Sequence, residues 1–256
     1  MTDSTFLERI LAVKEKEVAA MEPQTMEPLR QSYSFYDHVK ANQNRIQLIA
    51  EVKKASPSLG DINTDVDIVK QAKTYEANGT AMISVLCDRE FFKGDTAYLE
   101  EISSQVAIPT LQKDFIIDEK QIIAGRNAGA TVVLLIVAAL SETRLKELYD
   151  FAYSIGMEAL VETHNLEELQ VAHSLGAKII GVNNRNLKTF QTNLETSVSL
   201  IPYLKDEAVY ISESALENGA DVAKIASAYD GILCGTALMT ADSVEEKVRE
   251  LCLDKS

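Results

Sequence analysis

From residue 46 onward, eight short apolar runs recur along the chain, each followed by a segment with helical periodicity. The runs cover residues 46–53, 81–86, 108–113, 131–137, 158–162, 178–183, 207–212 and 230–235. They are almost wholly apolar, whereas a strand with one face in water would alternate apolar and polar side chains. Both faces of the sheet must therefore be covered, which predicts a parallel sheet flanked by helices.

Glycines mark the ends of several helical segments. Gly79, Gly129, Gly156 and Gly176 each stand shortly before the next run, where a residue in the left-handed conformation commonly closes a helix. Eight strand–helix units predict an α/β fold, the (β/α)8 or TIM barrel. A doubly wound open sheet is the alternative. No Gly-x-Gly-x-x-Gly motif follows any run, which weakens the dinucleotide-binding form of that alternative.

A helical segment precedes the first run. Thr5 and Glu8 have the spacing of a capping box at the start of an amphipathic helix, and a second short helix is expected over residues 34–40. We therefore expect one barrel domain over residues 1–256, of which residues 1–45 are an N-terminal helical extension.

Composition narrows the classes of partner. The formal charge of −14 argues against nucleic acid and anionic membranes, because both favour basic surfaces. Cys87, Cys234 and Cys252 show no metal-ligand spacing and suit reduced thiols. We find no basic-then-apolar leader and no apolar run near the ~18 residues of a membrane span, so we expect a cytoplasmic protein. We also expect a monomer.

Polar residues end six of the eight runs, at the edge where a barrel gathers its reactive groups. They are Glu51 and Lys53; Lys113 and Asp114; Glu162 and His164; Asn183, Asn184 and Arg185; Ser212, Glu213 and Ser214; and Gly235 with Thr236. One such end alone would more simply be a solvated strand end. Charges that end this many buried strands must be paired or used, because burying an unpaired charge is expensive. The pattern therefore predicts a site at this rim.

The first run leads into a loop. Glu51 and Lys53 are two residues apart and should point to the same side of their strand. Pro57 cannot easily extend the strand, and Gly60 permits a sharp bend. We expect these two residues to be the stiff and the soft points of a lid over the site.

The residue types at the rim suit acid–base chemistry. Lys53 and Lys113 can neutralise anions or donate protons, and Glu162 can act as a base on the opposite wall. The three histidines of the chain form no ligand set with carboxylates at helical spacing, so no catalytic metal is expected. His164 is expected to lie beside the site or in solvent.

The ends of the last two runs are where barrels commonly hold a phosphate, with loop amides and the start of a short helix. The corresponding residues here are Ser214, Ala215, Gly235 and Thr236. Taken alone, two tight turns would account for them equally well.

Five motifs are spread over nearly the whole chain: IAEVKKASPS at 49–58, LQKDFIID at 111–118, LVE at 160–162, IGVNNRNL at 180–187 and ISES at 211–214. Together and in this order, they resemble the motifs of the indole-3-glycerol phosphate synthase family. The resemblance implies a TIM barrel whose N-terminal helical extension lies across the barrel mouth. It also implies a tryptophan-biosynthetic lyase without a cofactor. Such an enzyme converts 1-(2-carboxyphenylamino)-1-deoxyribulose 5-phosphate to indole-3-glycerol phosphate and releases carbon dioxide and water.

The resemblance implies a role for each matching residue. Lys113 matches the general acid that protonates the ribulose carbonyl, and Glu162 matches the general base. Lys53 matches a lysine that contacts substrate anions, including the phosphate, with Glu51 beside it. The other matches are Ser56 and Pro57 in the mobile loop, Phe92 in the apolar wall for the aromatic ring, Asn183 and Arg185 that orient the substrate, and Ser214, Ala215, Gly235 and Thr236 around the substrate and its phosphate.

Three residues depart from the family's pattern. Cys87 replaces threonine, Gln112 replaces arginine and Ala215 replaces glycine. The first two adjoin the catalytic positions and should matter little. Ala215 touches the phosphate loop, and we expect its backbone to adopt an ordinary conformation. Glycine there should then change KM by less than about threefold.

Two other functions are open at the level of sequence. A class I aldolase would use Lys53 or Lys113 as an imine-forming amine, and borohydride trapping would reveal it. A barrel kept as a binding or assembly module would have lost its activity. Intact Lys53, Lys113 and Glu162 argue against the module.

Overall fold

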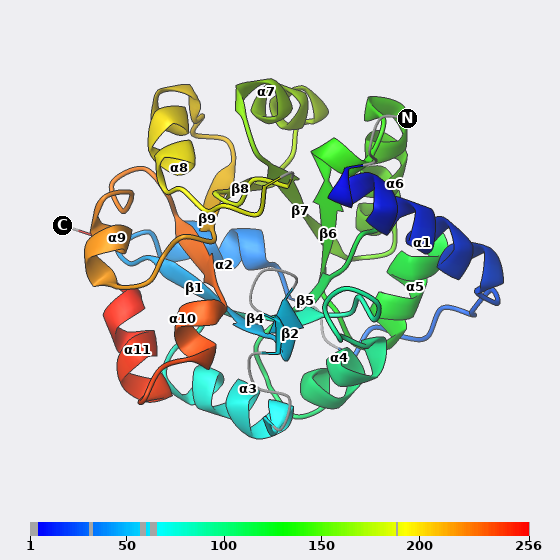
Figure 1. Ribbon diagram of the computed structural model, residues 1–256, viewed down its shortest axis with the longest axis horizontal. Coiled ribbons are helices and arrows are strands. Elements are labelled where there is room, and N and C mark those ends of the chain that lie inside the picture. The colour runs from blue at the N-terminus through cyan, green and yellow to red at the C-terminus, as the bar shows by residue number, and fades with distance from the viewer. Residues whose placement is uncertain (1–4, 31–32, 57–59, 62–65, 188, 256) are drawn as a thin grey trace.

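The computed structural model describes residues 5–30, 33–56, 60–61, 66–187 and 189–255. Parallel strands close into a barrel in the order β1-β10-β9-β8-β7-β6-β5-β4 (Figure 1). Their bounds are β1 Gln47–Val52, β4 Met82–Leu86, β5 Thr110–Lys113, β6 Val132–Ile136, β7 Glu158–Thr163, β8 Ile179–Asn183, β9 Val209–Glu213 and β10 Gly231–Cys234. The predicted (β/α)8 barrel is confirmed.

Helices surround the strands as an outer layer (Figure 1). They are α3 Ile68–Ala77, α4 Thr96–Ser103, α5 Glu119–Asn127, α6 Glu142–Ser154, α7 Leu166–Leu175, α8 Glu195–Leu200, α9 Gly219–Ala223, α10 Thr236–Met239 and α11 Val244–Leu251, with 3-10 turns η1 Val137–Ala139 and η2 Ile201–Tyr203. After β1, the short strands β2 Ala55–Ser56 and β3 Gly60–Asp61 pair in antiparallel fashion. Among the helices of the described residues, none is both long and apolar enough to cross a bilayer.

The element boundaries agree closely with the sequence pattern. Each barrel strand lies within two residues of its predicted run; the largest shift is at β9, predicted over 207–212 and observed at Val209–Glu213. The glycines expected to close helices all have positive φ, at +89°, +95°, +82° and +75° for Gly79, Gly129, Gly156 and Gly176. The left-handed conformation predicted at these positions is confirmed.

Side chains along a strand divide between two apolar clusters. On β1, Ile49 belongs to the cluster inside the barrel. Its neighbours Leu48 and Ala50 belong to the cluster between strands and helices. Both faces of the sheet are therefore buried, which is why the strands lack polar alternation.

The first helix of the extension covers the mouth of the barrel. Helix α1 (Phe6–Ala20) begins at Thr5, whose side chain and that of Glu8 form the predicted capping box. Its residues Phe6, Leu7 and Ile10 line a cavity at the carboxyl ends of the strands. In Figure 1, α1 lies in front of the strands.

The second helix closes the opposite end. Phe35 and Val39 of α2 (Phe35–Ala41) pack into the cluster inside the barrel, and α2 lies behind the strands in Figure 1. Glu158, the first residue of β7, accepts a hydrogen bond of 2.6 Å from the backbone N–H of Phe35. The extension is therefore divided between the two ends of the barrel, whereas the family resemblance implied a placement across the mouth.

Candidate active site

Two cavities with shared walls lie at the carboxyl ends of the strands. One, of about 110 Å³, is bounded mainly by apolar side chains and by α1. The other, of about 880 Å³, lies beside the ends of β9 and β10. Glu51, Lys53, Lys113, Arg185 and Ser214 line both. The mouth thus offers one site with an apolar half and a polar half.

Four ionisable side chains from alternate strands meet where the cavities join. Glu51 comes from β1, Lys113 from β5, Glu162 from β7 and Glu213 from β9. Lys113 Nζ lies 2.9 Å from Glu162 Oε2 and 3.3 Å from Glu213 Oε2. Inward side chains from alternate strands fill a barrel in layers, and here one layer consists of ionisable groups.

This charged layer rests on an apolar one. Two residues earlier on the same four strands stand Ile49, Leu111, Leu160 and Ile211, all fully buried in the cluster inside the barrel. A spacing of two keeps each pair on the same face of its strand. Little water reaches the charges from below, so their mutual interactions are stronger than at an open surface.

Mutual pairing sets the protonation of this layer. Burial alone would lower the pKa of Lys113, but Glu162 and then Glu213 outweigh it and raise that pKa well above its usual value. Burial would raise the pKa of Glu162, but Lys113 and then His164 hold it well below the usual range. Burial raises the pKa of Glu213 to about 8 against the opposing charge of Lys113, and the nearby Glu162 adds to the rise. At neutral pH, an ammonium group therefore faces one ionised carboxylate and one carboxyl group that is largely protonated.

His164 is part of this network. Its Nε2 lies 3.2 Å from Glu162 Oε1, and its Nδ1 lies 2.9 Å from Glu168 Oε2. Burial would lower the pKa of His164, but the two carboxylates raise it to about 10. The imidazolium form donates from Nδ1 to Glu168 and forms an ion pair with Glu162 through Nε2. The sequence left two positions open for His164, beside the site or in solvent. The structure places it beside the site.

Glu51 and Lys53 form the predicted pair on one face of the first strand. Lys53 Nζ is 2.8 Å from Glu51 Oε1 and donates to Thr236 Oγ1 at 3.3 Å. Burial would raise the pKa of Glu51, but Lys53 and then Lys113 lower it. The carboxylate therefore stays ionised between two lysines, and Lys53 reaches across to the start of α10.

Two glycines make room for these carboxylates. A Cβ atom at Gly181 on β8 would collide with Glu213 Oε1, and a Cβ atom at Gly235 after β10 would collide with Glu51 Oε1. Gly235 was singled out as a phosphate-binding residue, and its φ is −125°. The space that it leaves for Glu51 is a separate reason for glycine at this position.

The ends of β8 and β9 are held together by amide side chains. Asn184 Nδ2 donates to Ser212 Oγ and to the backbone oxygens of Glu213 and Ser214, at 3.0, 3.0 and 3.1 Å. Asn183 Oδ1 accepts from the backbone N–H of Arg185 at 3.0 Å. These hydrogen bonds fix the backbone of the segment that contains Arg185, whose side chain lines both cavities.

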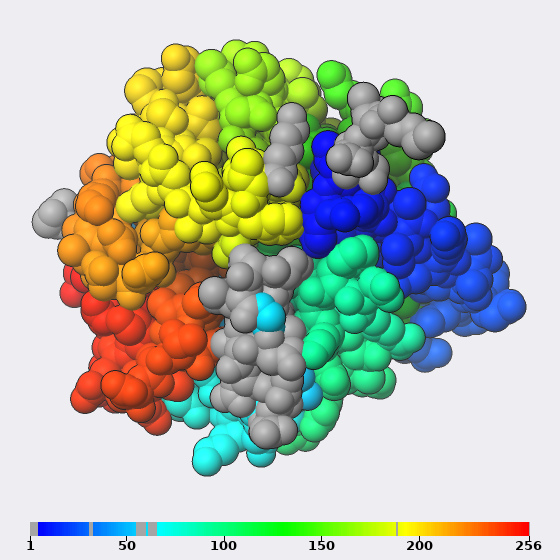
Figure 2. Space-filling view, in the orientation of Figure 1, coloured from blue at the N-terminus to red at the C-terminus, as the bar shows by residue number. Residues whose placement is uncertain are grey.

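Aromatic and aliphatic side chains form the apolar half. Phe92 and Phe115 line the smaller cavity with ring centroids 6.1 Å apart. Phe6 of α1 contacts Phe190 edge to face, with centroids 4.5 Å apart. Figure 2 shows the same neighbourhood on the surface, where the blue helix α1 adjoins the yellow segment after β8. A flat aromatic group would fit such a setting.

Most residues predicted for the site line one or both cavities. They are Glu51, Lys53, Phe92, Lys113, Glu162, Asn183, Arg185, Ser214, Ala215, Gly235 and Thr236. Pro57 lies outside the described residues. Ser56 belongs to β2, and its side chain is outside the description as well.

Sequence reasoning missed two parts of the site. Glu213 appeared only as one polar residue at the end of a run, although Val209 and Ile211 show the inward spacing of two that leads to it. The resemblance placed the extension across the mouth but named no residue of α1 as part of the site, whereas Phe6 and Ile10 line the smaller cavity. A helical period does not say which apolar side chains of a helix reach a cavity.

The expectation that the backbone of Ala215 adopts an ordinary conformation is wrong. Its φ is +58°, and Ser214 before it has φ +65°, so two consecutive non-glycine residues are left-handed. The backbone N–H of Ser214 donates to Leu233 O at 3.3 Å, and Asn184 holds the carbonyl of Ser214 from the other side. The chain leaves β9 through a turn that these bonds impose, at a local cost for each Cβ.

The other two departures lie behind the site. Neither Cys87 nor Gln112 lines either of the two cavities in the described part of the chain. Gln112 donates from Nε2 to Gln121 O at 3.1 Å, between β5 and α5.

Comparison with known proteins agrees with this architecture. The family model "Indole-3-glycerol phosphate synthase" matches residues 7–251. A protein named indole-3-glycerol phosphate synthase from Streptococcus thermophilus (strain CNRZ 1066) is 68% identical over 250 residues, which cover 98% of each chain. One of the same name from Streptococcus pneumoniae (strain CGSP14) is 64% identical over the same length and coverage.

Ala215→Gly should stabilise the protein. Alanine costs on the order of 1–2 kcal/mol in the left-handed region, and the greater freedom of glycine in the unfolded chain offsets about 0.5–1 kcal/mol of that. We expect the free energy of unfolding in urea to rise by up to about 1 kcal/mol. Ala215→Val should lower it, and equal values for all three proteins would show that the turn is unstrained.

His164 should stabilise the fold in a pH-dependent way. Its pKa of about 10 in the folded protein exceeds the ordinary value of about 6.5. The stabilisation is therefore complete below about pH 6.5 and lost as the pH rises through about 10. The difference in unfolding free energy between wild type and His164→Gln should shrink over that interval.

His173 provides the control, because burial lowers its pKa. The stability difference between wild type and His173→Gln should show no such decline between pH 6.5 and 10. A His164 ring resonance that titrates near pH 6.5 in nuclear magnetic resonance would refute the assignment.

Proposed function

Because this chain belongs to the indole-3-glycerol phosphate synthase family, we propose that its barrel mouth closes the indole ring with Lys113 as general acid and Glu162 as general base. The reaction converts 1-(2-carboxyphenylamino)-1-deoxyribulose 5-phosphate to indole-3-glycerol phosphate in tryptophan biosynthesis. The observation that carries the assignment is the buried ion pair between Lys113 Nζ and Glu162 Oε2, at 2.9 Å.

The acid step begins at the ketone of the ribulose chain. Lys113 is protonated and faces the cavity, so it can donate a proton to the carbonyl oxygen as the ring carbon that bears the carboxylate attacks. The tertiary alcohol forms, and loss of carbon dioxide returns the bond electrons to the ring. Departure of the hydroxyl group as water then needs a proton from an acid and removal of a proton by a base.

Proton transfer couples the acid to the base. A carboxylate whose pKa is far below the usual value is a weak base. In the free enzyme burial would raise the pKa of Glu162, and Lys113 is the largest of the influences that lower it instead. Once Lys113 has given its proton to the substrate, the positive charge beside Glu162 is gone and its pKa must rise. Glu162 thus becomes a competent base only after the acid has acted.

The remaining residues bind and orient the substrate in this proposal. Lys53, paired with Glu51, takes the substrate anions, and Asn183 with Arg185 orients the chain. Phe92 packs against the aromatic ring. The phosphate lies in the larger cavity, against Lys53 and the loop formed by Ser214, Ala215, Gly235 and Thr236, and Ser56 and Pro57 are assigned to substrate binding.

The pairing of both lysines weighs against an imine-forming aldolase. An amine must be neutral to attack a carbonyl, and Lys113 lies between two carboxyl groups that hold it protonated. Lys53 is likewise paired with Glu51 at 2.8 Å. We further propose that the enzyme acts in the cytoplasm as a monomer, on a phosphorylated small molecule and not on nucleic acid or membranes.

Lys113→Ala and Glu162→Gln should each lower kcat by about a hundredfold or more, the usual scale for groups of this kind. Indole formation from the carboxyphenylamino substrate can be followed by fluorescence, because the chain contains no tryptophan. Lys146→Ala, at an exposed surface pair, is the control and should leave kcat unchanged. Near-normal turnover in either site variant would refute the role assigned to that residue.

Activity should survive exhaustive dialysis against a strong chelator. Among the described residues, no group of three or more His, Cys, Asp or Glu side chains is placed to hold a metal ion. Loss of turnover that returns on adding a divalent cation would contradict metal independence.

A further inference from the structure

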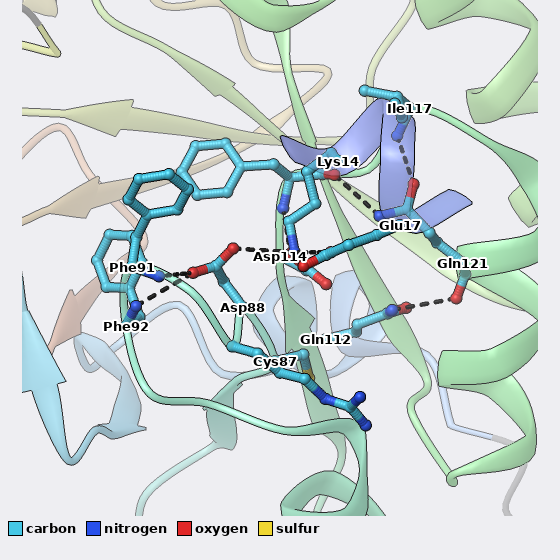
Figure 3. Close-up of polar contacts among 12 residues, drawn as sticks. Lys14, Glu17, Cys87, Asp88, Phe91, Phe92, Gln112, Asp114, Ile117 and Gln121 are labelled. Carbon is cyan, nitrogen blue, oxygen red and sulfur yellow. Dashed lines mark hydrogen bonds and ion pairs between the residues drawn. The ribbon is translucent and has the colours of Figure 1, made fainter. Parts of the chain in front are cut away.

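A buried lysine connects the N-terminal helix to the rim of the barrel. Lys14 of α1 is 1% exposed. Its Nζ lies 2.9 Å from Asp88 Oδ2, 2.9 Å from Asp114 Oδ1 and 2.8 Å from Glu17 Oε2 (Figure 3). Asp88 follows β4 and Asp114 follows β5, so one ammonium group joins three elements that are distant in sequence.

Each aspartate also organises the turn that follows its strand. Asp88 Oδ1 accepts from the backbone N–H groups of Phe91 and Phe92 at 2.7 and 3.1 Å, as Figure 3 shows. Asp114 Oδ1 accepts from the backbone N–H of Phe115 at 2.8 Å. The two turns therefore present Phe92 and Phe115, whose rings line the apolar half of the site.

The same helix supplies the roof of that half. Phe6 and Ile10 of α1 line the cavity, and the Phe6 ring contacts Phe91 edge to face with centroids 5.3 Å apart. We propose that Lys14 is a positioning residue, whose ion pairs with Asp88 and Asp114 hold the roof and both aromatic walls at the spacing that admits the substrate ring. This inference rests on the proposed function, because it identifies that ring as the carboxyphenyl group.

Lys14 can hold the two turns in place because its positive charge compensates the carboxylates of Asp88 and Asp114. Without its ammonium group, Asp88 and Asp114 would face each other as two buried carboxylates, which must separate or take up a proton. Either change moves the turns that carry Phe92 and Phe115. Lys113 adjoins Asp114 in sequence, but its ammonium group is held independently by Glu162 and Glu213. The effect should therefore fall on binding of the ring and not on acid–base chemistry.

Lys14→Met tests the inference in the full-length enzyme. We expect KM to rise about tenfold and kcat to change by less than about threefold. The dissociation constant of indole-3-glycerol phosphate, read from its own indole fluorescence, should rise by the same factor as KM. The inhibition constant of inorganic phosphate should stay within about twofold, because phosphate occupies the other half of the site.

Lys120→Met is the matched control. Lys120 of α5 donates to the backbone oxygens of Val18 and Met21, at 3.3 and 2.9 Å, and so tethers the same helix without touching either aspartate. The Lys120→Met variant should have a lower midpoint of thermal unfolding, but its KM and its affinity for the product should stay within about twofold of wild type. Equal rises in KM for the two variants would show that Lys14 only holds α1 in place, as Lys120 does, and would overturn the inference.

Other outcomes are equally decisive. An unchanged KM in Lys14→Met, or a parallel loss of phosphate affinity, would contradict the proposal. If Lys14→Met does not fold, Asp88→Asn replaces it and should raise KM about threefold with phosphate inhibition unchanged; no change would again refute the proposal. A wild-type enzyme that neither forms nor binds the indole product would instead refute the proposed function.

Discussion

The charge state of the buried groups at the barrel mouth depends on the ion pairs of Lys113. A buried ammonium group is stable only with carboxylates around it, and those carboxylates are stable only with the ammonium group between them. Burial favours the protonated form of both acids, but Lys113 and His164 outweigh it at Glu162, which is ionised. At Glu213, burial and the charge of Glu162 outweigh Lys113, so this acid is largely protonated. The positions of the protons therefore belong to the group as a whole, and a substrate that removes one proton changes the affinity of every partner.

The closed barrel is what allows such a group to exist. Inward side chains of alternate strands lie at the same level, so residues more than 160 positions apart, such as Glu51 and Glu213, share one layer. The apolar layer beneath excludes water from below. Gly181 and Gly235 leave space that any side chain would take from the two carboxylates.

The N-terminal extension completes the barrel at both ends, by different physical means. Helix α2 fills the lower opening with Phe35 and Val39, and its N-terminus is bonded to Glu158. Helix α1 covers the mouth and is bound through buried charge at Lys14. The lower closure is thus mostly apolar, whereas the upper one ties the roof of the site to the strand ends that carry its walls.

The barrel, its strand positions, the left-handed glycines and the shared face of Glu51 and Lys53 can be predicted from the sequence, because each depends on a local period or a local conformational preference. Three features become visible only in the folded chain: Glu213 faces Lys113, Lys14 bridges two strand ends, and Ala215 is left-handed. These features depend on which strand ends meet when the barrel closes and on the hydrogen bonds imposed there. Such contacts join residues far apart in the chain, so no local pattern of residues records them.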